Sequence, residues 1–280
     1  MPLRKRALRS ERATDDMADS EPRPSLRVRY KDLAPRAIVG IALIAIALLG
    51  GWQGGLFFNF LIGLAALLMF REWGRMHGTR RSARLSGYVG IAAAMVLANE
   101  GLILLGAAAL AVTAAIYAFR DRSASIGIVY AGAPALALIW LRSQEQGMSI
   151  LIWTLAIVWA TDICAYFAGR TIGGPKLAPR ISPSKTWAGL IGGMAGSAAV
   201  SAGLTALLTL PFSLVLAIIL GAVLAVAAQI GDFYESHLKR RAGVKDSGNL
   251  LPGHGGVMDR LDGLVPVSLI VAGAVWLLQF

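Results

Sequence analysis

Apolar residues gather into nine runs along the chain, and short polar segments separate these runs. A helix needs about 20 residues to cross the hydrocarbon core of a bilayer, so the shortest runs must include flanking residues or pair into hairpins. The pattern predicts an all-α polytopic membrane protein with about nine transmembrane helices. The runs are residues 37–50, 56–70, 85–98, 101–119, 126–141, 148–169, 187–208, 213–230 and 264–280.

The basic residues lie on one side of the membrane if the chain crosses it nine times. Of the 27 lysines and arginines, 26 fall in the N-terminal tail and alternate connections, which are residues 1–36, 71–84, 120–125, 170–186 and 232–262. Arg142 is the exception. Lysine and arginine concentrate in loops that stay in the cytoplasm during insertion. The sequence therefore predicts a cytoplasmic N-terminus and a C-terminus outside.

The composition excludes a soluble globular domain. Hydrophobic residues make up 56% of the chain and charged residues 15%, and the mean hydropathy is +0.63; soluble domains are less apolar. The single cysteine, Cys164, excludes a disulfide framework and a thiolate metal site. We ascribe most of the net charge of +11 to a basic inner face beside anionic lipids, and not to nucleic-acid binding.

A polar stretch at residues 236–262 interrupts this apolar sequence. It holds five basic and three acidic residues. Placing charge beside hydrocarbon costs free energy, so such residues are usually paired or functional. The stretch therefore indicates chemistry on phosphates at the membrane surface.

Two carboxylates, Asp162 and Asp232, lie within or at the edge of apolar runs. An ionisable residue at this depth is a candidate site residue, because an unpaired carboxylate in hydrocarbon is costly. Two alternatives remain open. Asp162 could make a polar contact between helices, and Asp232 could simply pair with Lys239 or Arg240.

Asp259 and Asp262 are three residues apart, so on a helical turn they would share one face, with Arg260 turned away. Carboxylate oxygens suit Mg²⁺, which takes one or two of them from a protein and completes its shell with phosphates and water. Asp232 and Asp259 flank the polar stretch and are natural ligands for this ion. The alternative is that these carboxylates cap a helix or form surface ion pairs.

Two loops have features typical of phosphate binding. The glycines of residues 252–256, PGHGG, let successive backbone amides point into one concavity. The other loop ends in Ser182-Pro183-Ser184-Lys185-Thr186 directly before a helix, where a capping role explains Ser184 or Thr186. A lysine at a helix start is unfavourable unless an anion binds there, so Lys185 indicates a phosphate.

Residues 236–262, SHLKRRAGVKDSGNLLPGHGGVMDRLD, resemble the signature of CDP-diacylglycerol synthases, also called phosphatidate cytidylyltransferases. The matching features are Ser-x-Leu-Lys-Arg, Lys-Asp, His-Gly-Gly and Asp-Arg-x-Asp. The segments DICAYFAGR and ISPSKTWAG also resemble this family, which extends the resemblance over residues 162–262. Ala188 departs from it, because relatives usually have a polar residue there. Residues 1–120 match chiefly in hydropathy, and we assign them no function.

The resemblance implies transfer of CMP from CTP to phosphatidic acid, with release of pyrophosphate, at the cytoplasmic side of a bacterial-type inner membrane. It implies Mg²⁺ on Asp232 and Asp259, with Asp246 and Asp262 either as further ligands or as residues that orient the ligands, and it allows a second cation. The expected catalytic residues are Asp232, Lys245, Asp246 and Asp259. The expected substrate-binding residues are Ser182, Lys185, Thr186, Lys239, Arg240, His254, Gly255, Gly256 and Arg260.

The chain then divides into three regions. Residues 1–36 are a basic cytoplasmic tail, residues 37–141 form about five transmembrane helices, and residues 142–280 form the catalytic membrane region with cytoplasmic loops 170–186 and 232–262. A homodimer is compatible with this organisation. Two other functions stay open: a CTP-dependent enzyme for an ether-linked or isoprenoid lipid phosphate, and a secondary transporter. A transporter should show an internal repeat, which the sequence lacks.

Overall fold

The computed structural model describes residues 33–179, 181–251 and 255–279, and in this part of the chain each of the nine apolar runs forms one helix. Five of these helices, α4, α7, α8, α9 and α10, are long and apolar enough to cross a membrane. The chain is therefore a helical integral membrane protein, while nine crossings and their direction stay a prediction. The helices are α3 (Leu33–Gln53), α4 (Gly55–Met76), α5 (Arg81–Asn99), α6 (Ile103–Tyr117), α7 (Arg122–Ser143), α8 (Gly147–Thr171), α9 (Trp187–Leu207), α10 (Leu214–Arg241), a single turn α11 (Met258–Leu261), and α12 (Leu264–Leu277).

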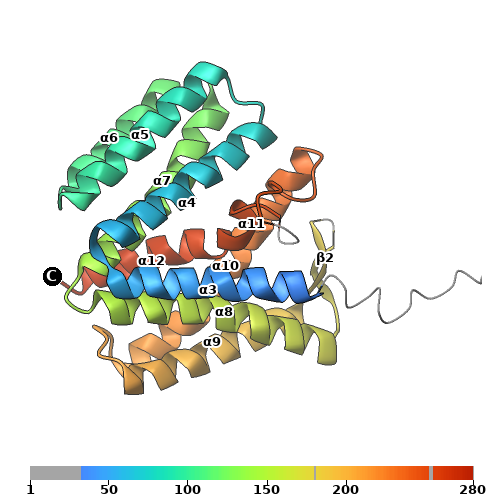
Figure 1. Cartoon of the computed structure of the whole chain (residues 1–280). Helices are drawn as coiled ribbons and strands as arrows, with labels where there is room; N and C mark the ends of the chain where they lie inside the picture. Colours follow the sequence, from blue (N-terminus) through green and yellow to red (C-terminus); the bar gives the residue numbers. More distant parts are fainter. Residues whose placement is uncertain (1–32, 180, 252–254, 280) are drawn as a thin grey trace, which may run out of the picture.

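The helices form two packed groups (Figure 1). Helices α4 to α7 enclose one core, which includes the buried side chains of Phe70, Trp73 and Ile128. Helices α8, α9, α10 and α12 pack around a second core, which includes Trp153 and Leu224. Helix α7 contacts α12 and α8, and α3 contacts α4 and α8. The two groups therefore share one continuous helical body.

Close packing of α9 on α8 depends on small residues. A Cβ atom on Gly192 would lie 2.2 Å from Cβ of Ala168, and one on Gly196 would lie 2.3 Å from Sγ of Cys164. Side chains without bulk let membrane helices approach closely. Ser201 on α9 also links the neighbouring helices by hydrogen bonds. Its hydroxyl accepts from Trp153 Nε1 on α8 at 2.9 Å and donates to the Ala217 carbonyl on α10 at 2.5 Å.

A short hairpin corrects the expectation of an all-α chain. Strand β1 (Lys176–Ala178) pairs antiparallel with β2 (Ser182–Thr186), so that Lys176 lies opposite Thr186. The chain turns after α8 at Gly173 and Gly174, whose φ angles of 69° and 92° suit glycine. The Thr186 hydroxyl then caps α9 by accepting from the Gly189 amide at 3.1 Å.

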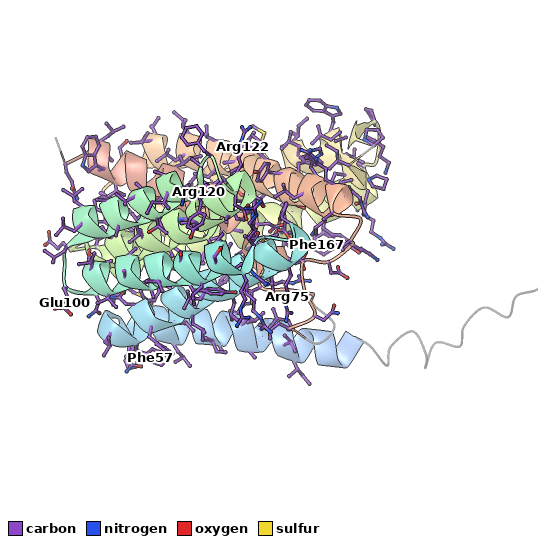
Figure 2. The ribbon with its side chains drawn as sticks, turned by 90° about the horizontal axis from the view of Figure 1, so that it is seen from above. Phe57, Arg75, Glu100, Arg120, Arg122 and Phe167 are labelled. Carbon is purple, nitrogen blue, oxygen red and sulfur yellow. The ribbon has the colours of Figure 1, made fainter. Side chains whose placement is uncertain are left out.

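The hairpin and α11 lie at the same end of the molecule, beside the C-terminal part of α10 (Figure 1). Figure 2 places Glu100 and Phe57 at one end of the body and Arg75 and Phe167 towards the other. The polar loops after α8 and α10 therefore meet at one end of the helical body.

Candidate active site

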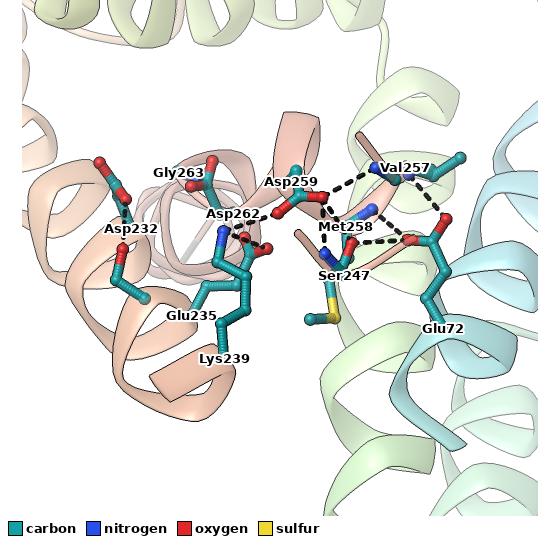
Figure 3. A network of polar contacts seen from close by, with 12 residues as sticks. Glu72, Asp232, Glu235, Lys239, Ser247, Val257, Met258, Asp259, Asp262 and Gly263 are labelled. Carbon is teal, nitrogen blue, oxygen red and sulfur yellow. Dashed lines mark hydrogen bonds and ion pairs between the residues drawn. The ribbon is translucent and has the colours of Figure 1, made fainter. Parts of the chain in front are cut away.

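Asp259 holds the loop between α10 and α11 together (Figure 3). Its Oδ2 accepts from the Ser247 amide at 2.9 Å, the Ser247 hydroxyl at 2.8 Å and the Gly256 amide at 2.8 Å, and its Oδ1 accepts from Lys239 Nζ at 2.6 Å. Burial alone would raise the pKa of Asp259, but the hydrogen bonds from Lys239, Gly256 and Ser247 outweigh it and lower the pKa to about 2. Asp259 is therefore an ionised anchor whose oxygens are engaged by the protein.

Lys239 joins two acidic side chains. Besides Asp259, its Nζ lies 3.2 Å from Oε1 of Glu235, which is one helical turn earlier on α10 and fully buried. A buried carboxylate needs a nearby cation to offset its desolvation. Lys239 therefore supplies positive charge to the last turns of α10 and to α11 together.

A second ion pair joins the hairpin to α10. Lys185 on β2 pairs with Oδ2 of Asp232, and its Nζ also donates to Oε1 of Gln229 at 2.9 Å. The other oxygen of Asp232 accepts from the Ser236 hydroxyl at 3.2 Å. The structure thus brings together the two loops that the sequence predicted to form one site, although Asp232 pairs with Lys185 and not with Lys239 or Arg240.

Three carboxylates influence one another at this end of the molecule. Burial raises the pKa of Asp262, and the neighbouring charges of Asp232 and Asp162 raise it further. One oxygen of Asp262 accepts from the Gly263 amide at 2.8 Å. Negative charge gathered in this way attracts a cation. Among the described residues, no group of three or more His, Cys, Asp or Glu side chains is arranged to enclose a metal ion by itself.

An apolar cavity of about 410 Å³ opens beside these carboxylates. Its walls are mainly aliphatic and aromatic side chains of α3, α4, α7 and α8, for example Leu43, Ile62 and Trp159, and part of its lining is polar: Asp162, Arg260 and Asp262. Binding sites often combine an apolar pocket with a few polar groups. The cavity therefore combines apolar walls with charged groups at one end.

The residues expected in the site fall into groups with different surroundings. Asp232, Lys185, Lys239 and Asp259 form the ion pairs above, and Arg260 and Asp262 line the cavity. Asp259 and Asp262 were expected to present one face, yet Asp259 binds the loop and Asp262 lines the cavity. Thr186 serves as the cap of α9, which is the structural role left open for it.

Other expected site residues are not brought into these networks. Arg240, Lys245 and Asp246 are exposed, and none of them forms an ion pair within the described parts of the chain. Ser182 starts β2 and is half-buried. Gly255 has a φ of 80°, and the Gly256 amide, expected to face a phosphate, donates to Asp259 instead. His254 lies outside the described residues.

The sequence did not identify Glu72 on α4 as part of this network. Its carboxylate is only 4% exposed and accepts from the Val257 amide at 2.9 Å, the Met258 amide at 2.8 Å and the Ser247 hydroxyl at 3.0 Å. The available signal was one acidic residue at the end of an apolar run. Its partners lie 175 or more residues away and are partly backbone groups, so no local pattern shows them.

Comparison with known proteins identifies the family of this chain. A model of the cytidylyltransferase family matches residues 34–278. Phosphatidate cytidylyltransferase from Brucella melitensis is 41% identical over 249 residues, covering 86% of this chain and 92% of the relative. The enzyme of that name from Pseudomonas aeruginosa is 37% identical over 264 residues, covering 87% of this chain and 97% of the relative. The chain belongs to the cytidylyltransferase family.

Proposed function

We propose that this protein transfers CMP from CTP to phosphatidic acid, giving CDP-diacylglycerol and pyrophosphate. The observation that supports this most directly is the cavity, because it places apolar walls for acyl chains next to Arg260 and the ionic networks of the polar end. A soluble nucleotide and a membrane lipid can meet at such a boundary. The names of the Brucella and Pseudomonas relatives agree with this substrate pair.

The reaction needs positioning and charge neutralisation more than proton transfer. An oxygen of the lipid phosphate attacks the α-phosphorus of CTP and forms a new P–O bond. The bond from the α-phosphorus to the bridging oxygen breaks, and that oxygen leaves on pyrophosphate. The attacking oxygen is already ionised at neutral pH, so no general base is required. The protein must align two polyanions and offset the charge of the leaving group.

The cations of the site divide between the two substrates by position. Arg260 lines the cavity and would hold the lipid phosphate where the headgroup leaves the apolar part. Lys185 lies beside Asp232 and would meet the phosphates nearest the reacting centre. Arg240 and Lys245 are exposed and would meet the triphosphate from the aqueous side. Lys239 is engaged by Glu235 and Asp259 and holds the site together.

The carboxylates fit a magnesium ion that is completed by substrate. Mg²⁺ in nucleotide sites takes one or two protein carboxylates and fills its shell with phosphate and water oxygens, so a cage of three protein ligands is not needed. We assign it to Asp232 and Asp262, whose negative charges repel each other, in place of Asp259, which accepts four hydrogen bonds from the protein against two for Asp232. When bound, the ion would polarise the reacting phosphate and stabilise pyrophosphate.

The proposed location is the inner membrane of a bacterial-type cell, with the polar end on the cytoplasmic side. The relatives come from bacteria, and basic residues concentrate in the loops at the polar end. CTP is a cytoplasmic metabolite, so this orientation gives it direct access to the site.

A panel of lipid acceptors tests the proposal. The purified protein in detergent, with Mg²⁺ and labelled CTP, should form a lipid-soluble cytidine product with phosphatidic acid. Ether-linked phosphatidic acid and an isoprenoid phosphate are the comparison acceptors. Product with either of these and none with phosphatidic acid would replace the proposed acceptor.

A further inference from the structure

Glu72 is a buried carboxylate whose hydrogen-bond partners all belong to the loop that precedes or starts α11. It lies on α4, in the N-terminal group of helices, and its partners are the hydroxyl of Ser247 and the amides of Val257 and Met258. Hydrogen bonds to a charged acceptor are stronger than those between neutral groups. Glu72 therefore attaches the N-terminal helices strongly to the loop between α10 and α11, which we call the catalytic loop because it carries proposed site residues.

The loop is shaped to admit this carboxylate. A Cβ atom on Gly248 would lie 2.8 Å from Oε1 of Glu72, and one on Gly256 would lie 2.4 Å from Oε2. Any side chain at these two positions would push the loop away from α4. Two glycines on separate parts of the loop thus leave room for one acidic side chain, which is an observation independent of the hydrogen bonds.

Glu72 and Asp259 bind the same hydroxyl from opposite sides (Figure 3). The Ser247 oxygen lies 3.0 Å from Oε2 of Glu72 and 2.8 Å from Oδ2 of Asp259. A serine hydroxyl has one proton to donate, so the two carboxylates share it. The position of Asp259, and with it the ion pair to Lys239, is therefore linked to Glu72.

The attachment sets where α11 begins. Val257 and Met258 precede Asp259 and Arg260 directly, so fixing their amides fixes the direction in which the following side chains leave the backbone. In this arrangement both Arg260 and Asp262 line the cavity. If the amides were released, both side chains would sample other positions relative to the lipid headgroup.

We propose that Glu72 is a positioning residue for CMP transfer: it holds the catalytic loop in the register that directs Arg260 and Asp262 to the cavity. This inference rests on the proposed function, since it concerns the same reaction. It also gives the N-terminal helices a role in the chemistry. Glu72 touches no reacting atom in this account and acts through the loop.

The test is Glu72→Gln, which keeps the size of the side chain but removes its charge. It also replaces one acceptor oxygen by an NH₂ donor, which would face the hydrogen-bond donors of the loop. We expect kcat to fall about 10- to 100-fold, the factor that corresponds to a lost hydrogen bond to a charged group. The KM values for CTP and phosphatidic acid should change less than kcat. Hydrogen exchange of the peptide that carries Val257 and Met258 should accelerate about as much as kcat falls, while the peptides of α4 keep their protection.

Two further variants complete the experiment. Glu100→Gln removes an exposed carboxylate at the other end of the molecule and should leave kcat and loop exchange unchanged (Figure 2). Ser247→Ala keeps the two hydrogen bonds that the Val257 and Met258 amides donate to Glu72. It gives a second measurement if Glu72→Gln fails to fold. Its loss of kcat should be smaller, and the loss from the double variant should be less than the product of the two single losses, because the residues act through one contact.

Three results would overturn the inference: an unchanged kcat in Glu72→Gln, a lower kcat without faster exchange of the loop peptide, or fully multiplicative losses in the double variant. Absence of CMP transfer in the unmodified protein would refute the proposed function and the catalytic part of this inference together. The exchange measurement would then still show whether Glu72 anchors the loop, so the two failures can be told apart.

Discussion

At the scale of single residues, the sequence identified the charged groups of the site but not their partners. Asp259 was expected to bind Mg²⁺ because of its residue type and spacing. In the structure Asp259 accepts from four hydrogen-bond donors, two of them backbone amides. Backbone amides become donors only when the loop folds around the carboxylate, so no pattern of residue types in the sequence predicts them. For the same reason Glu72 could not be found from the sequence.

The hydrogen bonds of Asp259 predict how stability depends on pH. Its pKa is about 2 in the folded protein and 3.8 as an ordinary value. A lowered pKa stabilises the fold above the unfolded value, and this contribution is lost as the pH falls from about 5 towards 2. We expect Asp259 to contribute about 2 kcal/mol at neutral pH. Thermal unfolding of the protein and of Asp259→Asn, followed from pH 6 to pH 3, measures it.

The exposed residue Asp246 supplies the control for this measurement. Asp246→Asn should retain the same decline of unfolding temperature with acid as the unmodified protein, because its carboxylate is exposed and forms no ion pair within the described residues. Asp259→Asn should show a flatter decline. Parallel curves for all three proteins would contradict the assignment of Asp259 as an ionised anchor.

The Lys185–Asp232 ion pair predicts a specific loss of activity. Lys185→Met keeps the length of the side chain but leaves Asp232 without its cation and removes positive charge from the reacting centre. We expect CMP transfer to fall at least about tenfold. Lys176→Met, which removes an exposed lysine from the other strand of the same hairpin, is the matched control. Equal activity of the two variants would exclude Lys185 from the site.

At the scale of elements, hydropathy was sufficient for the helices and insufficient for the hairpin. Each apolar run became a helix because the driving force, removal of apolar surface from water, is visible in the sequence. The hairpin at residues 176–186 has two short strands of mixed polarity. The glycines that precede it, Gly173 and Gly174, are equally typical of an irregular loop. The hairpin is positioned by contacts with the neighbouring helices α8 and α9. No pattern in the sequence predicts these contacts.

Close packing of α8 and α9 predicts different effects for two glycine substitutions on one helix. Gly192→Ala places a methyl group 2.2 Å from Cβ of Ala168 and should destabilise the protein by about 1–3 kcal/mol, as overpacking does. Gly203→Ala meets open space and should be neutral or slightly stabilising, because alanine favours a helix. Unfolding temperatures in detergent compare them. Equal temperatures would show that α8 and α9 are not packed this closely.

At the scale of the whole molecule, the site needs both helical groups. The motif resemblance covers residues 162–262, and residues 1–120, which match chiefly in hydropathy, were assigned no function. In the structure α3 and α4 contribute lining residues to the apolar cavity, and α4 supplies Glu72 to the loop between α10 and α11. Contacts between distant segments depend on how whole helices pack. The sequence therefore predicted the helices but not the contribution of α3 and α4 to the cavity and the loop.

The proposal that the cavity holds acyl chains predicts a selective effect on the lipid substrate. Ala65→Phe adds bulk to the cavity wall, whereas Leu64→Phe changes the adjacent exposed residue, which does not line it. We expect Ala65→Phe to raise the KM for long-chain phosphatidic acid about tenfold while the KM for CTP is unchanged. Steady-state kinetics with each substrate varied in turn provide both values. A similar change in both variants would place the acyl chains elsewhere.

Transfer of CMP from a nucleotide to a lipid phosphate can be followed with CTP labelled with ³²P at either the α- or the γ-phosphate, in the presence of phosphatidic acid and Mg²⁺. We expect the α-label to enter the lipid phase only when phosphatidic acid is present, while the γ-label stays in water as pyrophosphate. Entry of the γ-label into the lipid would show phosphoryl transfer, and absence of both labels from it would show no transfer at all. Either result would rule out CMP transfer by this protein.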